Sequence, residues 1–212
     1  MDKEKEEKIN HYRELNRTAR RGEIVCAGSS LMEMFPVSQL AQEAGCEKVI
    51  YNRGVSGFIT DELLENLDVC ILDLKPARLF INIGTNDLND PAVTADDLMK
   101  KYDCILNLVE AALPQTEIYL MAYYPVNYEA AAEDMKECLR VRNNGRINEA
   151  NEHVRKLAEK HGKRYIDVNR MLKDEEGRLR AEFTIEGMHI NEQGYRAMFP
   201  DFLAYVNEPS WK

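Results

Sequence analysis

Short, almost continuously apolar runs alternate along this chain with longer segments of mixed polarity. The apolar runs cover residues 23–27, 48–52, 78–84, 117–123 and 164–168. Each run is rich in Val, Ile, Leu and Tyr and has the length of a strand rather than a helix. Because polar residues rarely interrupt these runs, they are predicted to be strands of a parallel sheet that is covered on both faces.

The segments between the strands have apolar residues at the spacing of amphipathic helices. In the clearest of them, Thr94 and Asp97 form a capping-box pattern at the start of a helix predicted over residues 94–113. Further helices are predicted over residues 145–161, over the charged N-terminal residues 1–21 at the surface, and from residue 191 onward. Strand alternating with helix predicts the α/β class, as a three-layer α/β/α sandwich with a five-stranded, mostly parallel, flavodoxin-like sheet.

Size and charge limit the classes of function. A length of 212 residues and a hydrophobic content of 44% predict one domain that spans residues 1–212. The formal net charge of -9 argues against nucleic acid or an anionic membrane surface as the main partner, since both attract basic surfaces. A signal-peptide pattern and an apolar run of membrane-spanning length are both absent, which predicts a cytoplasmic protein without integral membrane association. A homo-oligomer remains open.

The cysteines give no sign of a disulfide framework or a metal site. The sequence has 5 of them, widely scattered and without a CxxC pair. Cys26, Cys70 and Cys104 have apolar neighbours in the sequence and are interpreted as small core residues.

Polar residues with catalytic potential follow the first three predicted strands. Ser30 follows the first strand, Gly57 lies in the NRGVSG stretch after the second, and Asn86 lies in the GTND stretch after the third. In a parallel sheet these strand ends share one edge, where ligands bind. The EGMHIN stretch before the last helix carries Glu186 and His189, and a returning loop could bring both to the same edge.

These residue types suit nucleophilic catalysis. A serine hydroxyl is a poor nucleophile unless a base lies within hydrogen-bond reach and a further group orients that base. His189 and Glu186 can supply the base and the orienting group for Ser30. Backbone N–H groups of Ser30 and Gly57, together with the Asn86 amide, can form an oxyanion hole.

Each of these residues taken alone also has a structural interpretation. Ser29 or Ser30 could cap a helix, Gly57 could permit a turn, Asn86 could cap the next segment, and His189 could bond a backbone carbonyl. The catalytic interpretation is favoured because it explains why all of them should meet at one edge of the sheet.

Four sequence blocks resemble those of the SGNH (GDSL-type) hydrolase family, in the family's order and over nearly the whole chain. GSSL stands where the family has GDSL, with Ser30 at the nucleophile, and NRGVSG places the oxyanion glycine at Gly57. GTND carries the family's asparagine as Asn86, and EGMHINEQGY matches DGxHxNxxGY with the general base at His189. The NRG and IGTND sequences are similar to those of the family branch that contains intracellular platelet-activating-factor acetylhydrolase subunits and lysophospholipase-like bacterial esterases.

The resemblance implies a serine esterase that hydrolyses carboxylic O-acyl esters. Nothing in so compact a chain indicates a long apolar tunnel, which predicts a short acyl group. The partner of this esterase would be a small-molecule ester, and no metal or other cofactor is needed. An acyl group would form on Ser30, with His189 as general base. Glu186 stands where the family has aspartate, so the site is either a triad with Glu186 as the acid or a Ser–His dyad. The alternatives are a lysophospholipase or thioesterase of the same mechanism, or a non-catalytic small-molecule binding domain.

Residues 123–145 are longer than a simple connection between a strand and a helix requires. The segment leaves the carboxyl end of the fourth predicted strand and should therefore border the site. It is either a surface helix with an ordinary buried stripe or a wall of the substrate site. In the second case an acyl pocket or a mobile cover would be formed by Tyr124, Tyr128, Met135 and Leu139, and an anionic substrate group would be met by Arg140 and Arg142.

Overall fold

The sheet has five strands, and all of them are parallel. The computed structural model describes residues 1–211. The strand order is β2-β1-β3-β4-β5. The strands are β1 (Ile24–Gly28), β2 (Ile50–Gly54), β3 (Arg78–Asn82), β4 (Glu117–Met121) and β5 (Arg164–Ile166). Each strand lies within two residues of its predicted run, which confirms the parallel α/β prediction.

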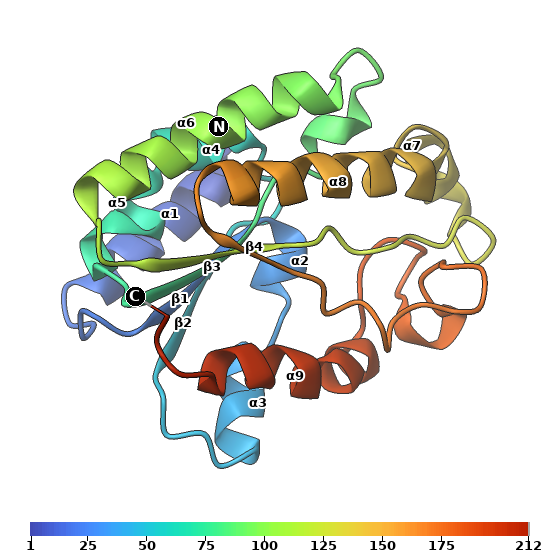
Figure 1. Ribbon diagram of the computed structural model, residues 1–212. Helices are drawn as coiled ribbons and strands as arrows, with labels where there is room; N and C mark the ends of the chain where they lie inside the picture. The colour runs from blue at the N-terminus through green and yellow to red at the C-terminus, as the bar shows by residue number, and fades with distance from the viewer. Residues whose placement is uncertain (212) are drawn as a thin grey trace.

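Helices cover both faces of the sheet and complete the predicted three-layer sandwich (Figure 1). The α-helices are α1 (Lys3–Asn16), α2 (Ser30–Glu33), α3 (Val37–Glu43), α4 (Thr60–Glu65), α5 (Leu67–Cys70), α6 (Ala95–Ala112), α7 (Lys136–Val141), α8 (Asn144–Lys160) and α9 (Glu192–Asn207). Short 3-10 turns are η1 (Leu72–Leu74), η2 (Asp87–Asn89), η3 (Glu133–Met135) and η4 (Ala181–Phe183). Helices α6, α8 and α9 match the predicted segments, whereas α1 is shorter than the predicted 1–21.

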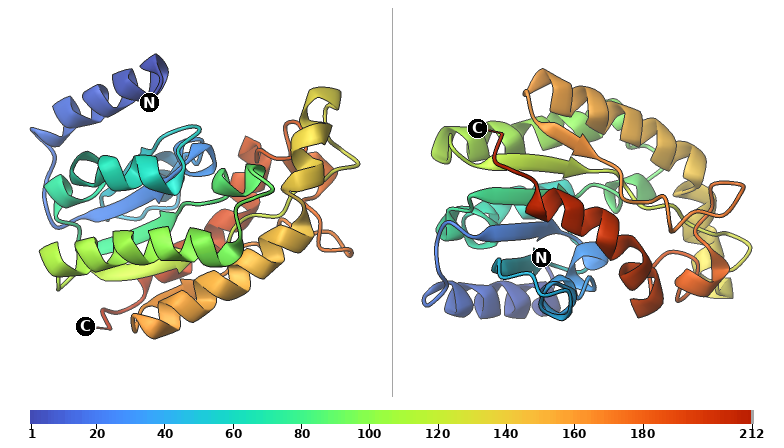
Figure 2. Two further views of the ribbon diagram at one scale, coloured as in Figure 1. Left: turned by 90° about the horizontal axis from the view of Figure 1, so that it is seen from above. Right: turned by 60° about the horizontal axis from the view of Figure 1, so that its bottom comes forward.

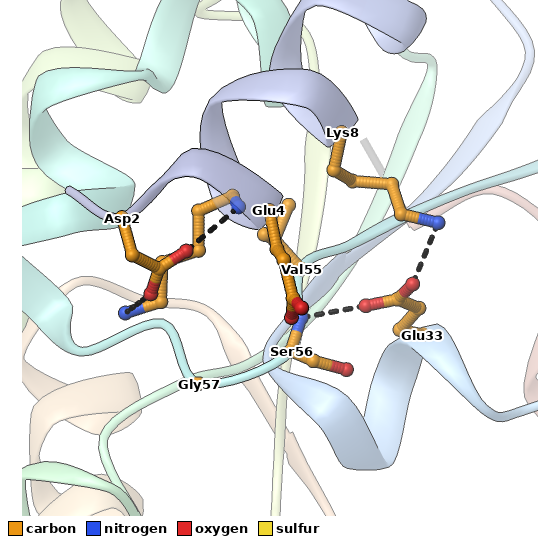
Figure 3. Close-up of a pocket in the computed structure, with 8 residues that line it drawn as sticks. Asp2, Glu4, Lys8, Glu33, Val55, Ser56 and Gly57 are labelled. Atoms are coloured by element: carbon orange, nitrogen blue, oxygen red, sulfur yellow. Dashed lines mark hydrogen bonds and ion pairs between the residues drawn. The ribbon is translucent and has the colours of Figure 1, made fainter.

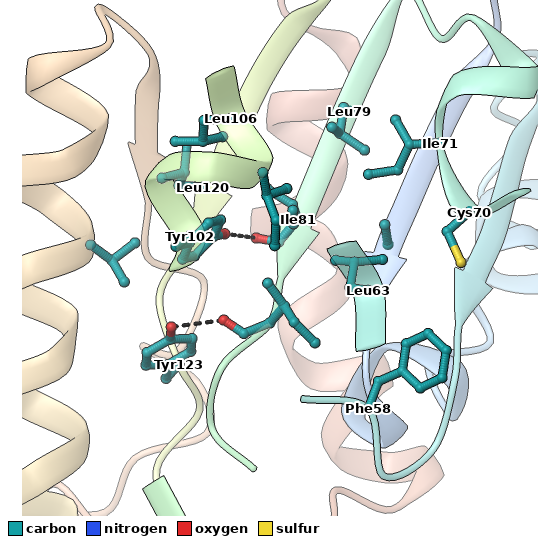
Figure 4. Packing of buried hydrophobic residues seen from close by; sticks show 14 of the residues in the cluster. Phe58, Leu63, Cys70, Ile71, Leu79, Ile81, Tyr102, Leu106, Leu120 and Tyr123 are labelled. Carbon is teal, nitrogen blue, oxygen red and sulfur yellow. Dashed lines mark hydrogen bonds between the residues drawn. The ribbon is translucent and has the colours of Figure 1, made fainter. Parts of the chain in front are cut away.

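Two separate cores lie on the two faces of the sheet. Along β1, Val25 and Ala27 face the core beneath α6 and α8, whereas Cys26 faces the core beneath α3 and α9. Figure 4 shows the first core, where the buried hydroxyl of Tyr102 donates to the Ile81 carbonyl oxygen at 3.2 Å. Both faces of each central strand are buried, which explains why the strand sequences are continuously apolar.

Helix α1 belongs to the first core and packs beside α5 (Figure 2). Its residues Ile9 and Tyr12 are buried, and the Tyr12 hydroxyl donates to the Gly54 carbonyl oxygen at 2.6 Å. Gly54 ends β2, so α1 is fixed next to the loop that follows this strand. None of the helices within residues 1–211 has both the length and the apolar character needed to cross a membrane.

The prediction for one cysteine is wrong. Cys26 and Cys70 are buried as expected, but Cys104 is exposed on α6. The buried stripe of α6 includes Tyr102, Ile105 and Leu106, and residue 104 lies on the opposite side of a helix with 3.6 residues per turn. Apolar neighbours in the sequence therefore did not make this position part of the core.

Candidate active site

The order of the strands places a topological switch point at β1. The chain passes from β1 to β2 on one side and then to β3 on the other side, so the strand order reverses at β1. Open parallel sheets bind ligands at such a switch point, outside the carboxyl ends of the strands. The loops with Ser30, Gly57 and Asn86 follow β1, β2 and β3, which are neighbours in the sheet.

Ser30 is the first residue of the short helix α2, directly after β1. Ser29 occupies the N-cap position in an extended conformation, and its side chain makes no capping hydrogen bond. Ser29 is only 2% exposed, whereas Ser30 is partly exposed. The Ser30 Oγ lies 3.0 Å from His189 Nε2. Of the two serines, Ser30 is therefore the one that reaches the surface and contacts a base.

A tight loop brings Glu186 and His189 to the same side. Thr184 and Ile190 pair in an antiparallel bridge that closes the loop. Gly187 has a φ of +97°, and a side chain there would lie 2.7 Å from neighbouring backbone atoms, so only glycine fits. Glu186 Oε1 accepts the backbone N–H of His189 at 3.2 Å and also pairs with the ring Nδ1 of His189.

Hydrogen bonds thus connect the hydroxyl, the imidazole and the carboxylate in series. The proton positions follow from these partners: Nδ1–H donates to Glu186, and Nε2 is left to accept from the Ser30 hydroxyl. This is the connectivity of a Ser–His–acid triad. The Glu186 side chain thus contacts a histidine three positions later in the same loop.

The loop after β2 presents a backbone N–H at the same edge. Phe58 N donates to the Val55 carbonyl oxygen at 3.1 Å, which closes a turn over residues 55–58. Gly57 is the third residue of this turn and has a φ of +75°, the conformation that a type II turn requires at this position. Within residues 1–211 the N–H groups of Gly57 and Ser30 make no hydrogen bond, so both remain available as donors.

The Asn86 side chain is held by contacts at both of its ends. Its Nδ2 donates to the Phe58 carbonyl oxygen at 2.9 Å, and its Oδ1 accepts from Arg142 Nη1 at 3.0 Å. An amide nitrogen carries two hydrogens, so the second one can serve another acceptor. The next residue, Asp87, accepts the backbone N–H of Thr60 at 3.0 Å. Burial raises the pKa of Asp87, and the Thr60 hydrogen bonds oppose that rise.

Comparison with protein families identifies the chain. The sequence model of the GDSL-like lipase/acylhydrolase family matches residues 27–197, which include all five site residues. The chain belongs to this family. It is therefore an ester hydrolase, as the four sequence blocks predict. Comparison with curated proteins gives no significant match.

Solved structures with the same fold are similar over almost their whole length. A Streptococcus pneumoniae protein named as a platelet activating factor is 31% identical with a TM-score of 0.85, and 96% of this chain and 93% of that chain are covered. A GDSL-like lipase from Bacteroides thetaiotaomicron is 19% identical with a TM-score of 0.76, and the match covers 93% of this chain and 96% of that chain. An acetylxylan esterase from Geobacillus stearothermophilus is 16% identical with a TM-score of 0.67, and the match covers 90% of this chain and 96% of that chain. The last two similarities concern the fold alone.

In this GDSL-like hydrolase, residues 123–145 pack against the loop that carries Glu186. Asn127 N donates to the Gly187 carbonyl oxygen at 2.7 Å, and Ala132 N donates to that of Glu186 at 3.3 Å. Tyr124 and Leu139 are each only 1% exposed and belong to the two cores. The segment therefore borders the site, but these two side chains do not line an open pocket.

The two arginines of this segment lie in different environments. Arg140 is exposed, whereas Arg142 is 2% exposed and contacts Asn86 instead of facing solvent. No sequence pattern indicates this contact, because positions 86 and 142 belong to separate loops. The family resemblance did not point to it either, since Arg142 lies outside the four blocks.

A hollow of about 530 Å³ lies beside Gly57, beneath the start of α1 (Figure 3). Glu33, from the helix that begins with Ser30, accepts the Ser56 N–H at 2.6 Å and pairs with Lys8 at 2.7 Å. Helix α1 thus contacts both the helix of Ser30 and the turn of Gly57. The charged residues that line the hollow are Asp2, Glu4, Lys5, Lys8 and Glu33.

Proposed function

We propose that this protein hydrolyses carboxylic esters through an acyl-enzyme on Ser30. The observation that carries the proposal is the hydrogen-bonded series from Ser30 through His189 to Glu186. In the first half-reaction the Ser30 oxygen attacks the ester carbonyl carbon, and its proton passes to His189 Nε2. Glu186 stabilises the imidazolium that forms. The tetrahedral intermediate then expels the alcohol, which takes the proton from His189.

Water completes the reaction. His189 removes a proton from a water molecule, which attacks the acyl carbon, and the carboxylic acid leaves as Ser30 regains its hydrogen. In both half-reactions the negative oxygen would be bound by the N–H groups of Ser30 and Gly57 and by Asn86 Nδ2. Donors that are fixed before the reaction stabilise this charge without a cost of reorientation.

We expect the acyl group to be short. The hollow beside Gly57 does not include Ser30 or His189 in its lining, and its mainly charged side chains provide no apolar channel for a long hydrocarbon chain on this side of the site. A series of p-nitrophenyl esters from acetate to palmitate tests this, and kcat/KM should be highest for the shortest chains. Acetylated sugars, a lysophospholipid and an acyl thioester distinguish the alternative substrates. Faster hydrolysis of the long-chain esters or of the lysophospholipid would contradict the expectation.

A fluorophosphonate probe separates catalysis from simple binding. The probe forms a covalent bond only with an activated serine, so an enzyme with a working Ser–His pair should be labelled with loss of activity. A non-catalytic binding domain on the same fold would remain unlabelled and would hydrolyse none of these esters.

Asn86→Ala should lower kcat by about 10²–10³-fold and leave KM nearly unchanged, because it removes a donor that acts on charge formed in the transition state. Initial rates with p-nitrophenyl acetate measure both constants. Asn89→Ala is a nearby control outside the proposed oxyanion hole and should keep most of the activity. A rise in KM with unchanged kcat would assign Asn86 to ground-state substrate binding.

A further inference from the structure

Arg142 is a buried cation that donates a hydrogen bond to a neutral amide. Its side chain is 2% exposed, and Nη1 donates to Asn86 Oδ1 at 3.0 Å. Within residues 1–211, its Nε is buried without an acceptor and no carboxylate lies within ion-pair distance, although the Glu186 carboxylate attracts the guanidinium from farther away. Buried charges normally need a counter-charge and several hydrogen bonds, so this arrangement is unfavourable for stability alone. A role in the adjacent site accounts for it.

The two contacts of Asn86 allow only one orientation of its amide. A guanidinium can only donate hydrogen bonds, so the Asn86 atom that faces Arg142 must be the oxygen. A carbonyl oxygen can only accept, so the atom that faces Phe58 must be the nitrogen. If the amide turned over, Oδ1 would meet the Phe58 carbonyl oxygen and Nδ2 would meet the guanidinium, and both contacts would be repulsive.

We propose that Arg142 is a positioning residue for the oxyanion hole, which fixes the Asn86 amide with its second Nδ2–H free for the substrate oxygen. The inference rests on the proposed acyl-enzyme function. A hydrogen bond from a cation to Oδ1 also polarises the amide and strengthens donation by its nitrogen. Arg142 would thus aid the reaction without touching the substrate.

Arg142 must be charged for this role, and it is. Burial lowers the pKa of its guanidinium to about 10, while the Glu186 carboxylate opposes the shift, so Arg142 remains protonated at neutral pH. The segment that carries Arg142 also contacts the Glu186 loop through the Ala132 N–H. One stretch of chain therefore supports both the proposed oxyanion donor and the proposed triad acid.

Kinetics of single and double variants test the proposal. With p-nitrophenyl acetate, Arg142→Gln should lower kcat by about 10- to 100-fold with little change in KM, because it removes part of what Asn86 contributes. Arg142→Lys keeps a cationic donor and should recover part of the loss. Arg140→Gln, at an exposed position of α7 two residues before Arg142, is the matched control and should keep full activity.

The double variant separates positioning from a purely structural role. If Arg142 acts through Asn86, adding Arg142→Gln to Asn86→Ala should change kcat less than about twofold. An equal loss in both backgrounds would overturn the proposal, as would a rise in KM for anionic esters without a fall in kcat. If Arg142→Gln does not fold, Arg142→Lys in both backgrounds gives the same comparison. Full activity after Ser30→Ala would instead refute the proposed function itself, whatever the Arg142 variants do.

Discussion

Ser30→Ala is expected to lower kcat by about 10⁶-fold, the size of effect seen when the serine of a catalytic triad is removed. The reason is that the proposed reaction passes through a covalent bond to this oxygen, which contacts His189 Nε2 at 3.0 Å. The kcat of the wild type and of the variant is measured from steady-state hydrolysis of p-nitrophenyl acetate, with an assay sensitive enough to detect the uncatalysed rate.

Ser29→Ala is the matched control for this variant. Ser29 precedes the proposed nucleophile, is 2% exposed and makes no side-chain capping bond to α2. Its hydroxyl is therefore expected to be dispensable, and most of the activity should remain. Similar losses from the two substitutions would mean that the turn itself, rather than the Ser30 hydroxyl, is being disturbed.

The second large effect is expected at Glu186. Glu186→Gln keeps the size of the side chain but removes the charge that stabilises the His189 imidazolium, and the amide can favour the wrong tautomer. In a working triad such a change costs about 10⁴-fold in kcat. Measurement of kcat against pH for the wild type and the variant tests this, because a tautomer defect persists at every pH at which the enzyme is folded.

Glu186→Asp is the companion variant, since it keeps the charge and shortens the side chain to that of the family's usual residue. It should retain more activity than Glu186→Gln. A loss below about tenfold for the glutamine variant, roughly 1.4 kcal/mol of transition-state stabilisation, would make the enzyme a Ser–His dyad.

Local patterns were sufficient to predict most of the fold. The strands were predictable because both of their faces are buried, so that almost every position is apolar. The proximity of Ser30 and His189 was also predictable, although 159 residues separate them. Parallel strands bring their carboxyl ends to one edge, so a motif at the end of a strand has a known location before any contact is known.

Contacts between loops were not predictable in this way. A contact of Arg142 with a substrate anion was one of two open alternatives, and the sequence has no local signal for the burial of this arginine, which donates to Asn86, 56 residues earlier. Cys104 was misassigned because neighbours in the sequence of a helix do not share one face. The Arg142 contact depends on how separate elements pack, which sequence periodicity does not describe, whereas the exposure of Cys104 follows from the periodicity of α6 itself.

Mass spectrometry of the trapped enzyme tests the central proposal most directly. The wild-type protein is treated with the fluorophosphonate probe and digested, and the modified residue is assigned from peptide fragments. We expect a single adduct, on Ser30. It should form at the same rate as esterase activity is lost, and it should be absent from Ser30→Ala. An adduct on another residue, or full hydrolytic activity without any adduct, would contradict the account.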